Sequence, residues 1–259
     1  MSVQAGDGAP TRMLAAVLVE PGRVELRNVP VPTPGPGELL VRVDAALTCG
    51  TDLKTYRRGH PKIPLPSPMG HELSGTVAAV GAGVDRFRES DAIACVPTVP
   101  CGECRLCRRG RESLCPDAVG RMVFGAFAEY VLLPRRLVER HVFPRPSSLS
   151  AEEAAALEPL ACVVHGASRV SFGDAEHVVL IGDGPISLLF VQVARLHGAG
   201  RVLVVGRHAG RLAVAEALGA ETLFVPRGHD PRDAVLQWTG GLGGDVVVES
   251  VGRPEVWET

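Results

Sequence analysis

Residues 177–200 read HVVLIGDGPISLLFVQVARLHGAG, an apolar run that enters a glycine-rich turn and continues into a helical segment. Such an apolar run is typical of a buried strand. Three further runs follow, RVLVVG, ETLFV and DVVVES, and a segment of helical character separates each run from the next. Strands that alternate with helices of about 10 to 15 residues form right-handed βαβ units. The sequence therefore predicts an α/β fold with a doubly wound parallel sheet in this half.

The turn GDGPIS, residues 182–187, has the composition of a dinucleotide-binding loop. Gly182 allows a tight turn after the strand, and Gly184 lets the backbone approach a pyrophosphate at the N-terminus of the next helix. Ser187 replaces the third glycine of the usual pattern, and serine is small enough that we expect modest strain and retained binding. A turn of this kind also occurs without a nucleotide, but the βαβ context favours the nucleotide.

The end of the second strand bears on the choice between NAD and NADP. In NAD enzymes an acidic residue there accepts hydrogen bonds from the adenosine ribose. Here Gly206 occupies that position and Arg207 follows it, so a guanidinium is available to a 2′-phosphate and no carboxylate repels it. NADP is favoured over NAD, although an arginine at a helix start is also a common solvent-exposed residue. The residues expected at the cofactor are Gly182, Gly184, Pro185, Ile186, Arg207 and Val251.

The first part of the chain is broken by proline and glycine into short β-branched runs such as GRVELRNV and ELLVRVDAAL. This spacing predicts a β-rich, barrel-like domain of short strands. From Ser150 the pattern changes to a helix with an N-cap serine. We expect a flexible N-terminus at residues 1–12, the β-rich domain at 13–148 and the nucleotide-binding domain at 149–259.

The composition excludes several classes of protein. The chain has 259 residues, with 27 basic and 29 acidic side chains and a net charge of −2. Because these charges are scattered, no basic surface for nucleic acid or an anionic membrane is indicated. No apolar segment approaches the roughly 18 residues needed to cross a bilayer, and the N-terminus lacks a secretion signal. These features predict a cytoplasmic protein that acts on a small molecule.

Four of the seven cysteines lie in CGECRLCRRGRESLC, at the spacing C-x2-C-x2-C-x7-C. In a reducing cytosol this spacing favours one Zn²⁺ held by four thiolates over two disulfides or plain buried thiols. A zinc with four protein ligands has no position left for a substrate, so this site is structural. Its expected ligands, in a lobe of about residues 97–118, are Cys101, Cys104, Cys107 and Cys115.

Several motifs occur in a specific order: CGTDL, GHELSGTVAAVGAGV, the four-cysteine segment, EPL, VVLIGDGPIS and GGDVVVESVG. This ordered set resembles the zinc-containing medium-chain alcohol and polyol dehydrogenases along nearly all of residues 13–252. The resemblance implies a GroES-like catalytic domain followed by a Rossmann domain, with a catalytic zinc between them. It also implies NAD(P)-linked oxidation of a secondary alcohol, polyol or aminated cyclic polyol to the ketone, or the reverse reduction.

The resemblance also implies a second set of zinc ligands, which is dispersed along the sequence. Cys49 and His71 correspond to two ligands of the catalytic zinc, and Glu72 to a carboxylate that binds or approaches the metal, directly or through water. Glu158 stands where alcohol dehydrogenases have cysteine and sorbitol-type enzymes have glutamate, so EPL favours the polyol branch. Asp52 corresponds to the carboxylate that orients the ligand histidine.

The implied reaction begins when zinc lowers the pKa of the substrate alcohol, after which hydride leaves carbon for the nicotinamide. Thr51 corresponds to the hydroxyl residue that takes the alcohol proton first. Where many relatives have a histidine that passes this proton to solvent, the chain has Lys54. This lysine serves the relay only with a depressed pKa, and a solvated lysine is the simpler interpretation.

The chain ends soon after the fourth strand, whereas a doubly wound dinucleotide fold normally has about six. We therefore expect a truncated chain or a fragment, whose full-length form would be a dimer or tetramer. Two other functions stay open. One is a zinc-stabilised remnant or binding protein without turnover, and the other is a zinc-free quinone or enoyl reductase of the same fold, which conflicts with both ligand sets.

Overall fold

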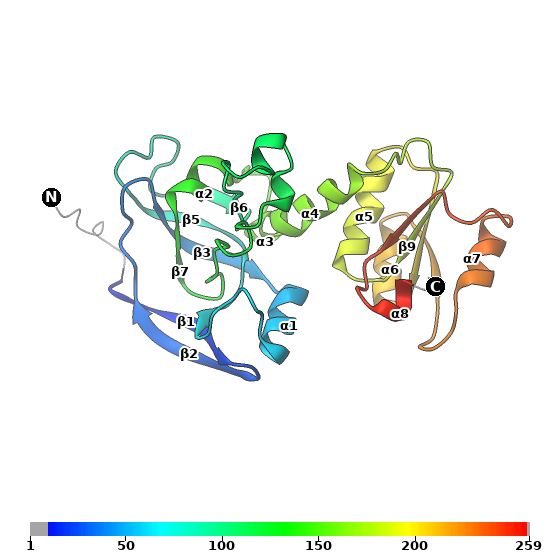
Figure 1. Cartoon of the computed structure of the whole chain (residues 1–259), viewed down its shortest axis with the longest axis horizontal. Helices are drawn as coiled ribbons and strands as arrows, with labels where there is room; N and C mark the ends of the chain where they lie inside the picture. The colour runs from blue at the N-terminus through cyan, green and yellow to red at the C-terminus, as the bar shows by residue number, and fades with distance from the viewer. Residues whose placement is uncertain (1–9, 258–259) are drawn as a thin grey trace. The chain divides into compact units, whose positions relative to one another are not determined.

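The computed structural model describes residues 10–257, which form two compact units that divide between Glu158 and Pro159 (Figure 1). Residues 1–9 of the expected flexible N-terminus lie outside the described residues, and the first strand begins at Arg12. The division falls later along the chain than the expected boundary at residues 148–149. Helix α3, Ala151–Ala155, packs against the sheet of the first unit, and for this reason the chain does not divide before it.

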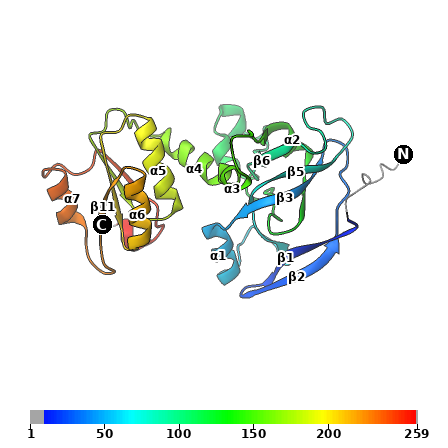
Figure 2. The same cartoon turned by 180° about the vertical axis from the view of Figure 1, so that it is seen from behind.

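The first unit is built of antiparallel strands in two sheets (Figures 1 and 2). A five-stranded sheet has the order β7-β3-β5-β6-β8. Its strands are β3 (Leu39–Leu47), β5 (Glu72–Val80), β6 (Ala92–Cys95), β7 (Tyr130–Leu133) and β8 (Val142–Pro144). A three-stranded sheet, in the order β2-β1-β4, consists of β1 (Arg12–Glu20), β2 (Arg23–Pro30) and β4 (Ser67–Pro68).

Short helices connect and cover these strands. The fully buried side chains of Leu39, Val41, Leu73, Ile93 and Leu133 come from four strands of the larger sheet and form the centre of the core. The helical segments of this unit, besides α3, are α1 (Gly50–Arg58), α2 (Arg135–Arg140) and the 3-10 turns η1 (Cys107–Arg109) and η2 (Glu112–Leu114). The two 3-10 turns lie within the four-cysteine segment.

The second unit contains the predicted parallel sheet, in the order β11-β10-β9-β12. Its strands are β9 (His177–Ile181), β10 (Arg201–Gly206), β11 (Glu221–Phe224) and β12 (Val246–Glu249). Its helices are α5 (Pro185–Leu196), α6 (Ala209–Ala217), α7 (Arg232–Trp238) and α8 (Pro254–Trp257), and α4 (Leu157–Ala167) leads into them.

Helices cover both faces of this sheet, as the predicted doubly wound fold requires. On one face, Leu180 and Val204 pack with side chains of α5 and α6. On the other, Val179 and Leu203 pack with Trp238 of α7. Figures 1 and 2 show α5 and α6 on one side of the strands and α7 on the opposite side. Within the described residues, no helix has the length and apolar character needed to span a bilayer.

Gly81, which follows β5, has no room for a side chain. A Cβ atom there would lie 1.8 Å from the carbonyl oxygen of Gly35 and 2.9 Å from that of Glu38. Because both obstacles are backbone atoms, we expect Gly81→Ala to lower the free energy of unfolding by about 2 kcal/mol or more. Urea denaturation measures the loss. Gly120→Ala is the control, since its Cβ would meet nothing nearer than 3.8 Å, and equal stability of the two variants would contradict the expectation.

Candidate metal and cofactor sites

Helix α1 begins with a pair of residues that cap each other. Cys49 is the N-cap residue, and its Sγ accepts a hydrogen bond from the backbone N–H of Thr51 at 3.5 Å. In return, Oδ2 of Asp52 accepts a hydrogen bond from the backbone N–H of Cys49 at 2.8 Å. This capping box holds the Cys49 thiol at the positive end of the helix dipole, where negative charge is favoured.

Strand β5 brings two further candidate ligands to the same place. His71 directly precedes the strand and Glu72 begins it, and both are buried. Ligand atoms of Cys49, His71 and Glu72 all lie within 4.8 Å of one another. Nδ1 of His71 lies 3.3 Å from Oδ1 of Asp52. This contact leaves Nε2 of the imidazole as the nitrogen available to a metal, as is usual where a carboxylate orients a ligand histidine.

The donor set fits a zinc ion. A thiolate, an imidazole and a carboxylate are the ligand types that zinc uses. Burial lowers the pKa of His71, but contacts with Asp52 and Cys49 outweigh burial and raise that pKa to about 10. Burial also raises the pKa of Glu72. The fully buried Nδ1 of His71 has no partner in full hydrogen-bond geometry within the described residues. A bound dication favours the deprotonated forms of all three side chains.

The remaining residues expected at this site differ in their surroundings. Glu158, the second residue of α4, is half-buried, and its side chain lies close enough to Glu72 to lower the pKa of that carboxyl slightly against the effect of burial. Thr51 is half-buried on α1, and Lys54 of the same helix is exposed. The structure thus gathers Cys49, Asp52, His71, Glu72 and Glu158, and leaves Lys54 in contact with solvent.

The four cysteines of residues 101–115 also converge. Their sulfur atoms lie within 4.8 Å of one another, and Sγ of Cys101 is 3.9 Å from Sγ of Cys107. Thiolates at the corners of a zinc tetrahedron lie about 3.8 Å apart, given a Zn–S bond of about 2.3 Å. All four are free thiols, as the prediction of a metal site rather than disulfides requires.

Backbone N–H groups support thiolates in this cluster. The N–H of Cys101 donates to Sγ of Cys115 at 3.2 Å and lowers the pKa of that thiol to about 7. The N–H of Cys104 donates to Sγ of Cys101, also at 3.2 Å. Burial raises the pKa of Cys107 to about 12. Four sulfur atoms this close lose all their protons only beside a cation, so the arrangement suits a metal with four thiolate ligands.

In the second unit, a cleft of about 650 Å³ opens where β9, β10 and β12 end. It is lined by Gly182, Gly184, Arg207 and Val251, four of the residues expected at the cofactor. Pro185 and Ile186 begin helix α5 directly after Gly184. A Cβ atom on Gly184 would meet nothing within 4 Å, so the backbone is open to a ligand there. The cleft therefore fits the predicted nucleotide site.

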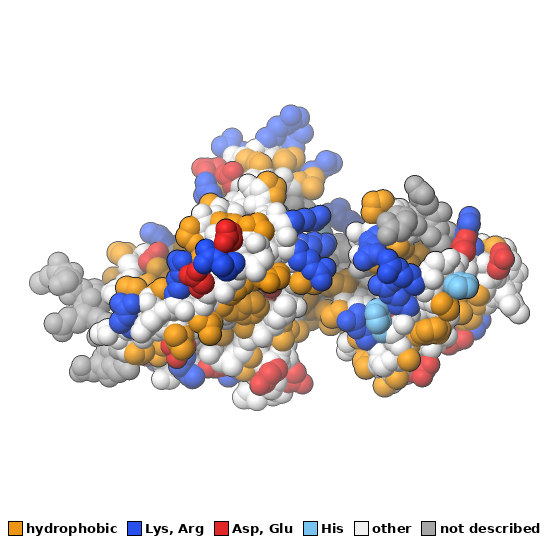
Figure 3. Space-filling model, turned by 90° about the horizontal axis from the view of Figure 1, so that it is seen from below, with side chains coloured by type: hydrophobic (Ala, Val, Ile, Leu, Met, Phe, Trp, Pro, Cys, Tyr) orange, Lys and Arg blue, Asp and Glu red, His pale blue; other side chains and the backbone are white. Residues whose placement is uncertain are grey.

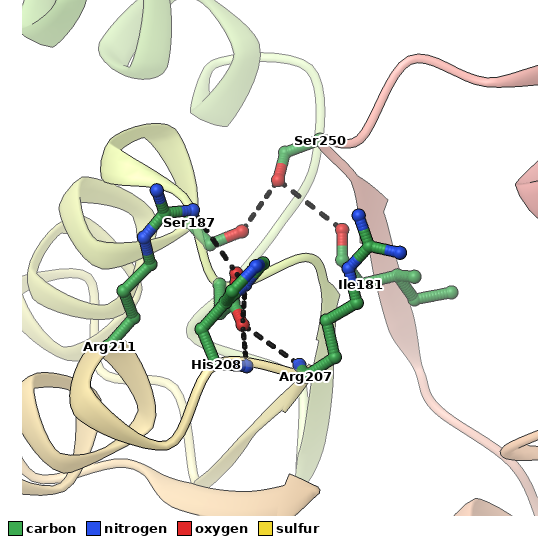
Figure 4. A network of polar contacts seen from close by, with 7 residues as sticks. Ile181, Ser187, Arg207, His208, Arg211 and Ser250 are labelled. Atoms are coloured by element: carbon green, nitrogen blue, oxygen red, sulfur yellow. Dashed lines mark hydrogen bonds and ion pairs between the residues drawn. The ribbon is translucent and has the colours of Figure 1, made fainter. Parts of the chain in front are cut away.

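Two serines close the base of the glycine-rich turn. Gly182 has φ of +116°, and a Cβ atom on it would lie 2.7 Å from Oγ of Ser250, so the turn requires glycine. Ser187 is almost fully buried, and its Oγ lies 2.6 Å from Oγ of Ser250. The Ser250 hydroxyl is also 3.3 Å from the carbonyl oxygen of Ile181 (Figure 4). Ser187 thus replaces the third glycine without leaving its hydroxyl unpaired.

Asp183, within the glycine-rich turn, was not among the expected site residues. Its side chain is almost fully buried, and its Oδ2 accepts hydrogen bonds from the backbone N–H groups of Arg207 at 2.8 Å and His208 at 2.7 Å. Burial raises the pKa of Asp183, but the hydrogen bonds from His208 and Arg207 outweigh burial and hold that pKa below its usual range. The sequence shows an aspartate within the glycine-rich turn, but it does not show that this side chain binds the backbone of Arg207 and His208, which lie in the turn after β10.

Basic side chains surround this cleft. Arg207, His208 and Arg211 are exposed at its rim, next to Asp183. Figure 3 shows basic side chains and histidines gathered on one face of this unit. Further along the chain, Arg227 and Arg253 also line the cleft. The cleft therefore favours a ligand with several negative charges.

Comparisons with known proteins identify the family of this chain. Residues 35–144 match the family described as the alcohol dehydrogenase GroES-like domain, and residues 185–259 match the family described as zinc-binding dehydrogenase. The chain belongs to the zinc-binding dehydrogenase family. This confirms the predicted fold class, a GroES-like domain plus a Rossmann domain, and the predicted class of oxidoreductase.

Three relatives illustrate the range of this family. Sorbitol dehydrogenase of Bacillus subtilis is 36% identical over 251 residues, which cover 95% of this chain and 70% of that enzyme. L-threonine 3-dehydrogenase of Symbiobacterium thermophilum is 37% identical over 252 residues, which cover 94% of this chain and 69% of that enzyme. A crystal structure from Sinorhizobium meliloti 1021, assigned as a zinc-binding dehydrogenase and bound to NADP, is 36% identical with a TM-score of 0.83. The aligned region covers 96% of this chain and 72% of the Sinorhizobium meliloti chain.

The lowered pKa of Asp183 makes a prediction about stability. A carboxyl whose pKa is depressed by folding stabilises the protein above its unfolded-state pKa, about 3.9, and loses this effect as pH falls through the folded-state pKa. We expect Asp183→Asn to be less stable than the parent chain at pH 7, with the difference shrinking below about pH 4. Urea unfolding over this pH range measures it. Asp233→Asn, at an exposed carboxylate, is the control; a pH-independent difference for Asp183→Asn would contradict the expectation.

Proposed function

We propose that this zinc-binding dehydrogenase oxidises a secondary alcohol, a polyol or an aminated cyclic polyol to the ketone, with NADP as the hydride acceptor. The observation that carries the proposal is the convergence of Cys49, His71 and Glu72, whose ligand atoms lie within 4.8 Å of one another. The similarity to a sorbitol dehydrogenase and to threonine dehydrogenases supports a hydroxyl-bearing substrate.

Cys49, His71 and Glu72 would hold the catalytic zinc, with Glu158 beside them. When bound, zinc supplies the Lewis acidity that makes an alcohol proton easier to remove. Asp52 is buried and faces Nδ1 of His71, and it therefore orients the imidazole. The glutamate at position 158, in place of a cysteine, supports a polyol over a simple alcohol.

Proton removal is assigned to the start of α1. The Thr51 hydroxyl lies one position before the buried Asp52 and is proposed to take the proton of the alcohol. Lys54 follows one turn later and is exposed; only its neutral amine has a lone pair for this proton, so solvent water is the simpler acceptor at this end of the relay. In this scheme Lys54 is the least sensitive position of the relay, because water can replace an exposed amine.

The cysteine cluster would hold a second, structural zinc. Four thiols fill a tetrahedral site completely, so this metal would stabilise the lobe and take no part in the reaction. Its removal would leave four sulfur atoms within 4.8 Å of one another without a cation between them. The two zinc sites therefore make different predictions for stability and for activity.

NADP is proposed as the cofactor on two grounds. Arg207 lines the cleft and is exposed, and no ion pair to its side chain exists among the described residues. A guanidinium of this kind binds a phosphate bidentately. The similar structure from Sinorhizobium meliloti 1021 was determined with NADP bound. The glycine-rich turn and the N-terminus of α5 would receive the pyrophosphate.

Zinc content tests the two metal sites. We expect about two zinc ions per chain, since each ligand set holds one. Cys104→Ser should lower this to about one and reduce the thermal midpoint markedly, because structural zinc contributes directly to folding. Cys49→Ser should also lower the content to about one, with loss of activity and a smaller change in midpoint. Elemental analysis and thermal denaturation measure both effects. Two zinc ions retained in either variant would refute the corresponding site.

Turnover and cofactor choice form a separate test. We expect NADP-dependent oxidation when the chain is screened with sorbitol, other polyols, secondary alcohols and threonine. Arg207→Ala should raise the KM for NADP about tenfold, because a charged hydrogen bond to phosphate is lost, and change the KM for NAD little. Arg88→Ala, at an exposed arginine outside the cleft, is the control. Cofactor binding without any alcohol-dependent reduction would instead favour a binding protein without turnover.

A further inference from the structure

We propose that Asp183 is a positioning residue that sets the cofactor preference of the cleft. It would fix the turn between β10 and α6 so that Arg207 and Arg211 flank the 2′-phosphate of NADP. The inference rests on the proposed NADP-linked function and assigns a role to the aspartate between the first two glycines of the glycine-rich turn.

The first step is the anchoring of the turn. Asp183 follows β9, yet both backbone donors that its Oδ2 accepts, the N–H groups of Arg207 and His208, follow β10. The carboxylate therefore ties the ends of two adjacent parallel strands together. Figure 4 shows Arg207, His208 and Arg211 gathered in one place, and each of them has a hydrogen bond or an ion pair with the Asp183 carboxylate.

The second step is charge. Nδ1 of His208 lies 2.9 Å from each oxygen of Asp183, and a guanidinium nitrogen of Arg211 lies 3.6 Å from Oδ1. The side chain of Asp183 is only 7% exposed, whereas those of His208 and Arg211 are 48% and 55% exposed. The carboxylate of Asp183 is thus buried and hydrogen-bonded, whereas the guanidinium groups of Arg207 and Arg211 are exposed at the cleft. A carboxylate engaged in this way positions its neighbours and does not bind the ribose hydroxyls itself.

The third step is the exclusion of a side chain at position 206. A Cβ atom on Gly206 would lie 2.6 Å from both Cβ and Oδ2 of Asp183. An NAD enzyme carries its ribose-binding acid at the end of this strand. In this chain an acid at position 206 would collide with Asp183 unless one of the two side chains moved. Positions 183 and 206 are therefore coupled: an aspartate at position 183, after β9, excludes an acidic side chain at position 206, the end of β10.

Two ligands that differ only in the 2′-phosphate, adenosine 2′,5′-bisphosphate and 5′-AMP, isolate its contribution to binding. Titration calorimetry measures the dissociation constant of each. We expect Asp183→Ala to raise the dissociation constant of adenosine 2′,5′-bisphosphate about tenfold and the dissociation constant of 5′-AMP less than about twofold. Asp183→Asn should fall between Asp183→Ala and the parent chain, because its amide oxygen still accepts a backbone N–H. Asp233→Asn, at an exposed carboxylate outside the cleft, is the control.

A reciprocal exchange tests the pairing of positions 183 and 206. Gly206→Asp alone should lower the thermal midpoint, because the new side chain collides with Asp183. The double variant Asp183→Gly/Gly206→Asp should recover most of that loss and bind NADH more tightly than NADPH. Gly210→Ala, whose Cβ would meet nothing within 4 Å, controls for the addition of a side chain near the cleft.

Each outcome supports or overturns the inference. If Asp183→Ala weakened the binding of both ligands equally, Asp183 would be a general structural residue. If Asp183→Ala bound the bisphosphate more tightly, the negative charge of Asp183 would oppose the 2′-phosphate. Either result overturns the inference alone. A parent chain that binds the two ligands equally well overturns the proposed choice of NADP, and the inference with it. A double variant as unstable as Gly206→Asp would overturn the pairing.

Discussion

The parallel pairing of β9 with β10 on one side and β12 on the other is the constraint on which the nucleotide-binding unit depends. Because all these strands end at the same edge of the sheet, the turns that follow them meet there. Gly182 after β9, Gly206 at the end of β10 and Ser250 after β12 thus border one cleft. In antiparallel pairing, neighbouring strands would end at opposite edges, and these turns would not converge.

Both units place a helix N-terminus where a negative group is to be held. In the first unit, Cys49 caps α1, and the capping bond with Asp52 also fixes the thiol. In the second, Gly184 precedes α5 and carries no side chain, which leaves the helix end open to a phosphate. The positive end of the helix dipole is thus capped by a cysteine side chain in the first unit, whereas in the second unit no side chain covers it and a ligand can approach.

Two buried aspartates, one in each unit, make the same two kinds of contact. Asp52 accepts the backbone N–H of Cys49 and faces Nδ1 of His71. Asp183 accepts the backbone N–H of His208 and faces Nδ1 of the same residue. In each case a carboxylate shielded from water joins a backbone donor to a histidine and restricts both. Such a carboxylate holds in place the groups that are proposed to bind a metal ion or a cofactor.

The sequence by itself determined the alternation of strands and helices after Ser150, the glycine-rich turn and the four-cysteine spacing, because these patterns are local and have a short period. The order of dispersed motifs also indicated Cys49, His71, Glu72 and Glu158 as one site, through the resemblance to a family. Only the tertiary structure decided that Asp183 reaches the turn after β10, and that position 206 has no room for an acid. Both depend on the pairing of β9 with β10, which brings together residues that are distant in sequence and leaves no local pattern.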